Sequence, residues 1–391
     1  MRFKYPRTSP FFVEKLLCLF NKDLNNFMHY WNSIDNKSWI FSRSTWSLVS
    51  IILLRTKLNK RKVIIWLPSY YCGSVINIIS RLNISIIYYE LDNCFNPIFP
   101  KLSKLNKPDI LVLVHYFPKA LNIPKLISDF DSKHTTIVED ATQCFLPYKN
   151  VGKFANFTMY SPYKFLPSSC GAILVSDQSL GHLNEDTRKH IVKQIEANFD
   201  DILESNFAST INFLKWFVKQ NLIRFNLFFI RKPFFELRPI FYPKIEHPNM
   251  SFLNYLIFRL NTLNIDFVKN RRENNLLVLT SFYKNLSKIN VTNNNFNTNV
   301  CNCLENHPYL PITLPIALNN VSDSLHMFNR FLKYGFHVNV WPDLPDFILN
   351  NSCDYDNTIN LRMTIIHLPI NQFINYNIED LNSLFENFKN K

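Results

Sequence analysis

Ile137-Val-Glu-Asp140-Ala-Thr-Gln143 has the pattern of an apolar strand that ends in polar groups. The same pattern returns in Tyr160-Ser-Pro-Tyr-Lys164-Phe-Leu-Pro167, which runs on to Cys170-Gly-Ala-Ile-Leu-Val175. An acid therefore follows one predicted strand, and a lysine follows the next. These two stretches decide the fold, because they place chemically useful side chains where strands of one sheet end.

Further β-rich runs precede and follow these stretches, and most are separated by enough residues for a crossover helix. Strands that alternate with such stretches predict an α/β fold with a largely parallel sheet. Ligand groups gather at the strand ends of such sheets, and His115, Asp140 and Lys164 each lie just past a run. The predicted strands are 63–67, 84–89, 110–114, 136–138, 157–160 and 172–175.

An acid and a lysine in this arrangement suit an enzyme that uses pyridoxal 5'-phosphate (PLP). The lysine amine condenses with the aldehyde of the cofactor, and the carboxylate keeps the pyridine nitrogen protonated so that the ring accepts electrons. Alone, Asp140 would more often be a helix cap and Lys164 a solvated surface residue. Only the pair points to the cofactor.

The remaining pattern predicts three regions. Residues 1–38 form an N-terminal helical arm, with a helix over 10–24, and residues 39–240 form the large cofactor-binding domain. Residues 241–391 form a smaller C-terminal α+β domain, with a long helix over 250–279 and a polar run at 293–302. A strand at 312–316, a helix at 324–334 and a strand-like run at 338–341 complete it.

From about residue 41 to about residue 372 the chain resembles the DegT/DnrJ/EryC1/StrS sugar aminotransferases, which have the fold-type I architecture of aspartate aminotransferase. The segments that carry the resemblance occur in the family's order. They are Ser42-Arg-Ser-Thr-Trp-Ser-Leu48, Leu67-Pro-Ser-Tyr-Tyr-Cys72, Ile86-Ile-Tyr-Tyr-Glu-Leu-Asp92, Val112-Leu-Val-His115, the acid and lysine stretches, Val340-Trp-Pro-Asp-Leu-Pro345 and Leu368-Pro-Ile-Asn-Gln372.

The resemblance implies a role for each matching residue. Lys164 corresponds to the lysine that binds the cofactor, and Asp140 to the partner of the pyridine nitrogen. Thr142 lies where the family packs a small residue under the ring, and Gln143 near the ring hydroxyl. The phosphate is expected at a helix start with Ser44 and Thr45, because free N–H groups and the helix dipole favour an anion there. Ser161 is a further phosphate candidate, and His115 either touches the ligand or bonds a neighbouring backbone.

The chain also departs from the family pattern. Arg43 or Ser42 replaces a glycine in the first phosphate turn, and Gly171-Ala172 replaces a glycine pair. Because glycine permits positive φ and close backbone approach, these changes affect how the cofactor is seated. Cys72 occupies the place of an aromatic ring that stacks on the cofactor, so Tyr70 or Tyr71 supplies that face or the face is absent. Asn371 stands where a histidine is common, and together with Tyr163 and Trp341 it is a candidate for the pocket wall, although core packing is favoured for all three.

By this resemblance we expect a cytoplasmic, homodimeric PLP-dependent aminotransferase. It would move an amino group from an amino-acid donor, expected to be glutamate, to a nucleotide-linked keto sugar in surface-polysaccharide or related biosynthesis. Asn249 and the cluster 269–272 are candidates for contacts to the neighbouring subunit's cofactor. A PLP-binding homologue with altered or lost transamination stays open as an alternative.

The charge of +13, from 43 basic and 30 acidic residues, leaves another alternative: a basic, non-enzymatic protein that binds membranes or nucleic acid. Nucleic acid is not the expected partner, because the charge is dispersed and no recognition motif is present. The aromatic and basic stretch 207–237 fits an interfacial helix on an anionic membrane or, preferably, a helical connector between domains. No stable membrane insertion is expected, because no window reaches about 18 apolar residues.

The eight cysteines are irregularly spaced, and several lie in apolar segments. This favours buried thiols, and no metal site is expected because Cys301 and Cys303 lack a second pair at zinc-site spacing. The N-terminal apolar stretch is interrupted by Glu14 and Lys15, which argues against a signal peptide.

Overall fold

The computed structural model of the chain describes residues 28–31, 37–59, 61–102, 107–117, 119–131, 133–148, 150–177, 184–224, 235, 237, 244–290, 310–333, 338–372, 376, 377, 379 and 381. Most of the predicted N-terminal arm, including its helix over 10–24, lies outside these residues, as does the polar run 293–302.

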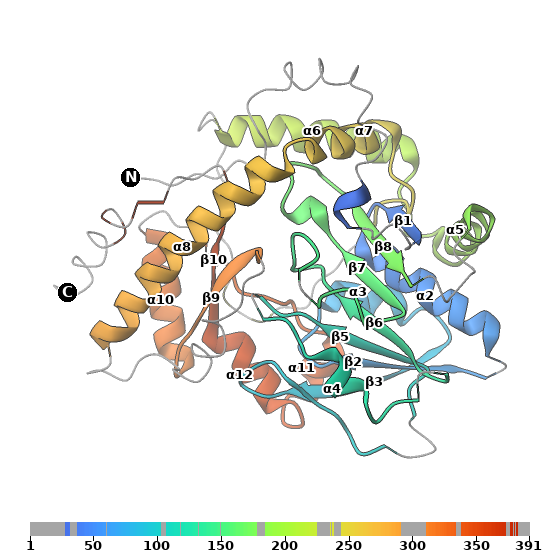
Figure 1. Ribbon diagram of the computed structural model, residues 1–391, viewed down its shortest axis with the longest axis horizontal. Coiled ribbons are helices and arrows are strands. Elements are labelled where there is room, and N and C mark those ends of the chain that lie inside the picture. Colours follow the sequence, from blue (N-terminus) through green and yellow to red (C-terminus); the bar gives the residue numbers. More distant parts are fainter. Residues whose placement is uncertain are drawn as a thin grey trace.

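The large sheet has eight strands in the order β1-β8-β7-β6-β5-β2-β3-β4 (Figure 1). The five strands from β7 through β6, β5 and β2 to β3 are parallel, and β8, β1 and β4 pair antiparallel at the edges. This confirms the α/β, mostly parallel prediction. The strands are β1 (Lys37–Phe41), β2 (Val63–Pro68), β3 (Ile84–Leu91), β4 (Pro97–Ile98), β5 (Ile110–Val114), β6 (Thr136–Asp140), β7 (Phe157–Tyr160) and β8 (Ala172–Ser176).

The central strands are buried on both faces, as their sequences predict. Every residue of β5 is buried, which is typical of a parallel strand with helices on both sides. Helix α2 is also enclosed, because every residue from Trp46 to Ile52 is buried. The helices of this part are α2 (Ser44–Leu58), α3 (Gly73–Ile79), α4 (Ile123–Ile127), α5 (Glu185–Phe199), α6 (Asn206–Arg224) and α7 (Phe252–Thr262).

A second, antiparallel sheet of β9 (Thr313–Ala317) and β10 (Ile365–Pro369) has its own apolar cluster. The long helix α8 and helix α10 pack on it, and this region lies beside the large sheet (Figure 1). It is the smaller α+β part that the sequence predicts, although the domain limits remain predictions. The helices here are α8 (Ile265–Asn290), α10 (Val321–Lys333), α11 (Asp346–Asn350) and α12 (Asp356–Thr364).

The structure corrects three expectations. The helix predicted over 250–279 is two helices, α7 and α8, which change direction at residues 263 and 264 (Figure 1). Strands β1, β4 and β10 were not predicted from the sequence, and the strand-like run predicted over 338–341 has only an isolated bridge at Asn339. Cys144 and Cys170 are buried thiols as expected, but Cys353 is exposed and Cys94 forms a disulfide.

Among the helices in the described ranges, none combines the length and apolarity required to cross a bilayer.

Candidate active site

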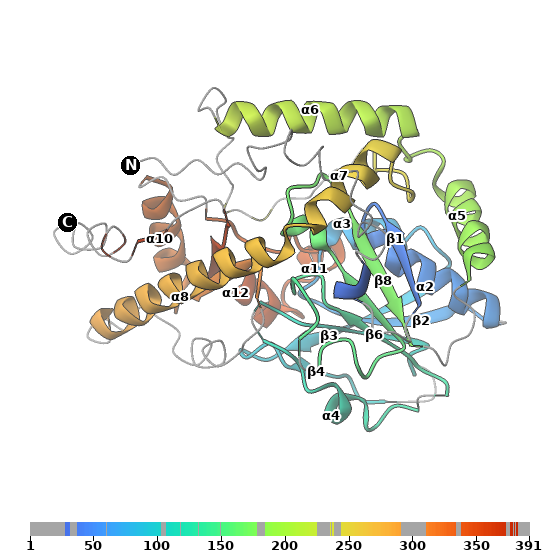
Figure 2. The same ribbon diagram turned by 45° about the horizontal axis from the view of Figure 1, so that its top comes forward.

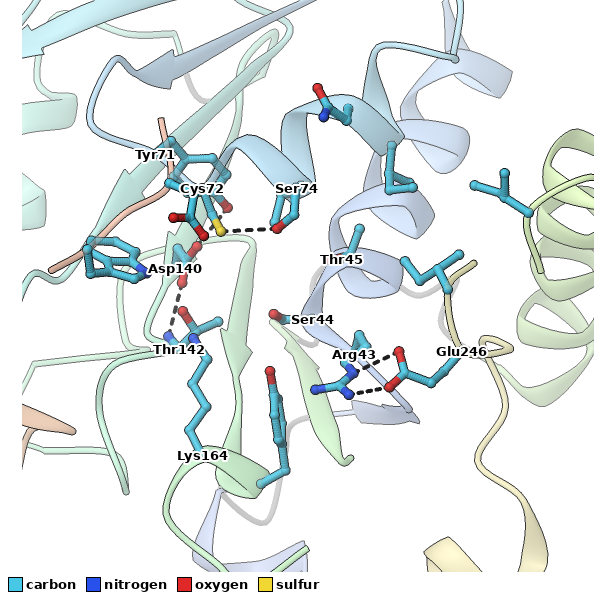
Figure 3. A pocket seen from close by; sticks show the side chains of 18 of the residues that line it. Arg43, Ser44, Thr45, Tyr71, Cys72, Ser74, Asp140, Thr142, Lys164 and Glu246 are labelled. Carbon is cyan, nitrogen blue, oxygen red and sulfur yellow. Dashed lines mark hydrogen bonds and ion pairs between the residues drawn. The ribbon is translucent and has the colours of Figure 1, made fainter. Parts of the chain in front are cut away.

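A pocket of about 840 Å³ opens where β6 ends and where helices α2 and α3 begin. It brings together most of the site residues that the sequence predicts, from segments far apart in the chain (Figure 3). These pocket-lining residues are Ser44, Thr45, Tyr71, Cys72, Asp140, Thr142, Gln143 and Lys164.

The acid of the pocket is held by two hydrogen bonds. Asp140 is the last residue of β6 and is 4% exposed. Its Oδ2 accepts a bond of 2.8 Å from the Tyr71 hydroxyl, and its Oδ1 accepts one of 3.0 Å from the backbone N–H of Thr142. Burial and the neighbouring Asp140 raise the pKa of Tyr71 well above its usual value, so the phenol stays protonated and donates. Lone pairs remain on both carboxylate oxygens for a further donor.

The lysine of the pocket has a free amine. Lys164 ends a short 3-10 turn, Pro162–Lys164, that follows β7, and its side chain extends toward Asp140 and Thr142 (Figure 3). Within the described part of the chain, no hydrogen bond or ion pair ends on its Nζ. A pocket-facing amine without a partner can react with a carbonyl group or carry a proton.

The amide of Gln143 has a fixed orientation. Its Oε1 accepts a hydrogen bond of 3.1 Å from the backbone N–H of Phe117, a residue with a φ of +53°. Such positive φ values are uncommon for a residue with a Cβ. Because the oxygen faces Phe117, the N–H donors of the amide remain for a ligand in the pocket.

The other end of the pocket is suited to an anion. Ser44 and Thr45 are the first residues of α2, whose first turn contains no acidic residue and no side-chain cap. The Trp46 N–H of that turn donates to the Arg43 carbonyl at 3.1 Å, so the N–H groups of Ser44 and Thr45 are the ones placed to bind a phosphate. Ser161 does not line the pocket, but its Oγ is fully buried and has no hydrogen-bond partner among the described residues.

Arg43 and Glu246 form an ion pair at this end that the sequence did not reveal. Arg43 Nε donates to Glu246 Oε2 at 3.1 Å, and a second guanidinium nitrogen contacts Oε1 (Figure 3). The guanidinium also lies over the ring of Tyr163, 4.6 Å from its centre. Burial opposes ionisation of Tyr163, but the charges of Arg43 and Lys164 outweigh it, so the pKa of this phenol lies below its usual value.

The part of the chain after α10 supplies the last wall of the pocket. Trp341 and Asp343 line it, from the segment noted in the sequence as a family landmark. Burial raises the pKa of the Asp343 carboxyl. This segment packs closely on the start of α3, because a Cβ on Gly73 would come within 2.7 Å of the Leu344 carbonyl oxygen. The glycine is therefore needed for the close approach of two backbones.

His115 lies outside this pocket and is completely buried. Its Nδ1 accepts from the Leu121 backbone N–H at 3.1 Å, so the proton is on Nε2, which donates to Glu139 at 2.8 Å. Both ring nitrogens are thus engaged in the protein, which corrects the expected contact with the cofactor and agrees with the structural alternative.

Several weaker candidates are resolved by their positions. Tyr163 and Trp341 line the pocket, whereas Asn371 does not. Arg272 is buried and bonds Gln372 and the backbone at Pro311, so it is not exposed for contact with a neighbouring subunit.

Asn249 lies in a separate hollow beside Trp39 and Tyr255 and accepts a hydrogen bond of 2.7 Å from Arg188.

The chain has the fold of solved aminotransferase structures. Helicobacter pylori PseC, an aminotransferase of pseudoaminic acid biosynthesis, has a similar structure, with a TM-score of 0.59, 15% identity, and coverage of 95% of this chain and 91% of that one. A DegT DnrJ EryC1 StrS aminotransferase from Brucella abortus is also similar, with a TM-score of 0.56 and 13% identity. The match covers 96% of this chain and 90% of that one.

E. coli GDP-4-keto-6-deoxy-D-mannose-3-dehydratase, with bound hydrated PLP, gives a TM-score of 0.62, 11% identity, and coverage of 99% of each chain. No protein-family model matches the sequence, and neither does any curated protein.

Proposed function

We propose that this chain is a PLP-dependent aminotransferase that transfers an amino group from an amino acid, expected to be glutamate, to a nucleotide-linked keto sugar. The observation that carries the proposal is that one pocket joins the unpaired amine of Lys164 to the buried, hydrogen-bonded carboxylate of Asp140. An amine to hold an aldehyde and an anion to hold a proton on the pyridine nitrogen are the two groups this cofactor requires.

The other residues of the pocket fit the rest of the cofactor. The free donors of Gln143 suit the ring hydroxyl, and Thr142 adjoins Asp140 beneath the place of the ring. The start of α2 at Ser44 and Thr45 suits the phosphate. Ser161 lies outside the pocket lining, and the contact of its buried hydroxyl with the phosphate stays a prediction. An unsatisfied buried hydroxyl costs free energy, and a ligand oxygen would remove that cost.

When bound, PLP supplies an electron-accepting ring that stabilises negative charge on the carbon beside the transferred nitrogen. The protein supplies the proton movements. Lys164 Nζ would take a proton from the α-carbon of the amino-acid donor as general base and later return it as general acid. Asp140 would hold the proton on the pyridine nitrogen, while Tyr71 and the Thr142 N–H fix its carboxylate. Trp341 and Asp343 form the wall beside which the second substrate would enter.

The substrate class rests on the similar structures. PseC is described as an aminotransferase in pseudoaminic acid biosynthesis, and the E. coli protein acts on a nucleotide-linked keto sugar. As part of the same proposal, the protein is a cytoplasmic homodimer with domain limits at residues 38 and 240. It acts in surface-polysaccharide or related biosynthesis, and Asn249 contacts the neighbouring subunit.

A second chemistry fits the same pocket. The E. coli structure is a dehydratase with this fold, and Cys72 lines the pocket where the family has an aromatic ring. The alternative is a protein that binds the cofactor but has altered or lost transamination. The experiments below distinguish this alternative from the aminotransferase.

The test begins with the absorption of the purified protein at neutral pH before and after borohydride. The wild type should carry a coloured cofactor that borohydride fixes covalently, and Lys164→Ala should not. Lys153→Ala, at an exposed lysine, is the matched control. Wild-type protein without a fixable cofactor would contradict the proposal.

The second step adds L-glutamate and then GDP-4-keto-6-deoxy-D-mannose and measures 2-oxoglutarate and amino sugar. Loss of the original absorption band on adding glutamate supports transamination. A band that persists with every amino acid tried indicates the altered chemistry instead.

A further inference from the structure

Helix α6 has two apolar faces, and only one of them packs against the protein. On the inner face Phe213 is buried against Ile257 and Leu260 of α7, with Trp216 and Phe217 at the edge of the cluster. This face forms the packed connector that the sequence favoured.

The outer face carries an apolar stripe of Phe207, Leu214 and Val218, which are 76%, 49% and 55% exposed. Their spacings of seven and four residues place them on one side of the helix. The stripe extends for about 16 Å along the axis at 1.5 Å per residue. Single exposed apolar residues are ordinary, but an aligned set marks a surface that binds something.

The charges beside the stripe are all of one sign. Lys215 and Lys219 are exposed, and each follows a stripe residue directly, so each lies about 100° around the helix from the stripe. The whole of Asn206–Arg224 contains basic residues and no acidic residue. Apolar side chains flanked by cations are what an anionic lipid surface accepts, with the rings among the acyl chains and the amines at the headgroups.

A second copy of this chain is a poorer occupant. In a symmetric dimer the same patch meets itself, so the exposed Lys215 and Lys219 of both copies would come together. The chain as a whole also carries a charge of +13. Among the described elements α6 lies outermost on its side in Figure 2, beyond α7.

We propose that α6 docks the protein on the surface of an anionic membrane through this stripe, without crossing the bilayer. The docking surface is connected to the pocket: Asn212 of α6 donates to both carboxylate oxygens of Glu204 at 2.9 Å, and Glu204 lines the pocket. This inference is independent of the reaction proposed above.

The experiment is co-flotation of the full chain with vesicles of phosphatidylcholine alone or with added phosphatidylglycerol. The wild type should float with the anionic vesicles and not with the neutral ones. Phe207→Ser/Leu214→Ser should weaken binding by at least about tenfold, since each substitution removes apolar area that would enter the lipid. Leu277→Ser, at an equally exposed position on α8, is the matched control and should bind as the wild type does.

The charge is tested separately, with substitutions at exposed lysines. Lys215→Glu/Lys219→Glu should weaken binding at least about tenfold, and more than Lys57→Glu/Lys62→Glu, a matched pair at other exposed positions. Circular dichroism checks that each variant is folded. Failure of the wild type to float, or equal losses in the α6 and control variants, would overturn the proposal. The proposal would also be overturned if the stripe variants changed the oligomeric state, measured by light scattering, but did not change vesicle binding. A second copy of the chain would then be what covers the stripe.

Discussion

The hydroxyl of Tyr71 donates a 2.8 Å hydrogen bond to Oδ2 of Asp140, and both residues are buried in the wall of the pocket. The two lie on different strand ends, 69 positions apart in the sequence. Tyr71 is therefore placed to orient the carboxylate rather than only to offer a ring face.

Tyr71→Phe keeps the ring and removes this donor. A hydrogen bond to a charged group contributes about 1.5 to 3 kcal/mol, and part of that would be lost from the orientation of Asp140. We expect the affinity for PLP to fall about tenfold, measured by absorbance titration of the apo-protein. Tyr116→Phe is the control, because its hydroxyl bonds the Tyr70 carbonyl instead. Equal affinities for the Tyr71 variant and the wild type would refute the orienting role.

Ser161→Ala should have opposite effects on stability and on cofactor binding. The Ser161 hydroxyl is buried and unpaired among the described residues, so removing it should leave the free energy of unfolding of the apo-protein unchanged or slightly higher. If this hydroxyl binds the cofactor phosphate, PLP affinity should fall about tenfold. Urea unfolding and PLP titration measure the two effects, and a loss of apo-protein stability without a loss of affinity would contradict the assignment.

Glu246→Gln should strengthen anion binding at the start of α2. Burial opposes ionisation of Glu246, but the attraction and hydrogen bond of Arg43 outweigh it and lower its pKa. Without that carboxylate the guanidinium has no counter-charge, so the dissociation constant of inorganic phosphate should fall about fivefold, measured by calorimetry. The free energy of unfolding should fall by about 1 kcal/mol. Glu185→Gln, at an exposed ion pair, should change neither quantity.

His367 should make the protein less stable in mild acid. Burial and the charge of Arg362 lower its pKa to about 3. The unfolded chain takes up this proton below about pH 6.5, and the folded protein does not until about pH 3. Between these values the unfolded state binds more protons, so the free energy of unfolding decreases as the pH falls, by about 2 kcal/mol between pH 6.5 and pH 5.

Urea unfolding at several pH values measures this slope. In His367→Gln the slope should flatten, whereas His134→Gln, at an exposed histidine, should keep it. A slope unchanged by the first variant would mean that another group dominates the acid response.

The sequence predicted the parts of this structure that depend on the pattern of neighbouring residues along the chain. The strands before Asp140 and Lys164 are short β-rich runs, and the acid and the lysine that follow them both line the pocket. The break between α7 and α8 was missed because Leu263 and Asn264 carry neither proline nor glycine, and the turn depends on what each helix packs against.

The ion pair of Arg43 with Glu246 could not be predicted, because 203 positions separate the two residues and only the folded chain brings them together. His115 shows the converse. A histidine just past a strand left two readings open, a ligand contact or a bond to neighbouring backbone, and the fold engages it with Glu139 and the Leu121 N–H.

Glu139 and Asp140 are consecutive on β6, and the pleat sends one carboxylate to the buried His115 and the other into the pocket. Sliding β6 forward by a single residue against β5 and β7 would put Glu139 in the place of Asp140 and Val138 in the place of Glu139. The pocket would then hold a longer acid, and the imidazole of His115 would lose its carboxylate. An insertion or deletion of one residue in the loop before β6 should therefore be tolerated only if the register of β6 stays the same. The length of that loop can vary in evolution, but the register of β6 cannot.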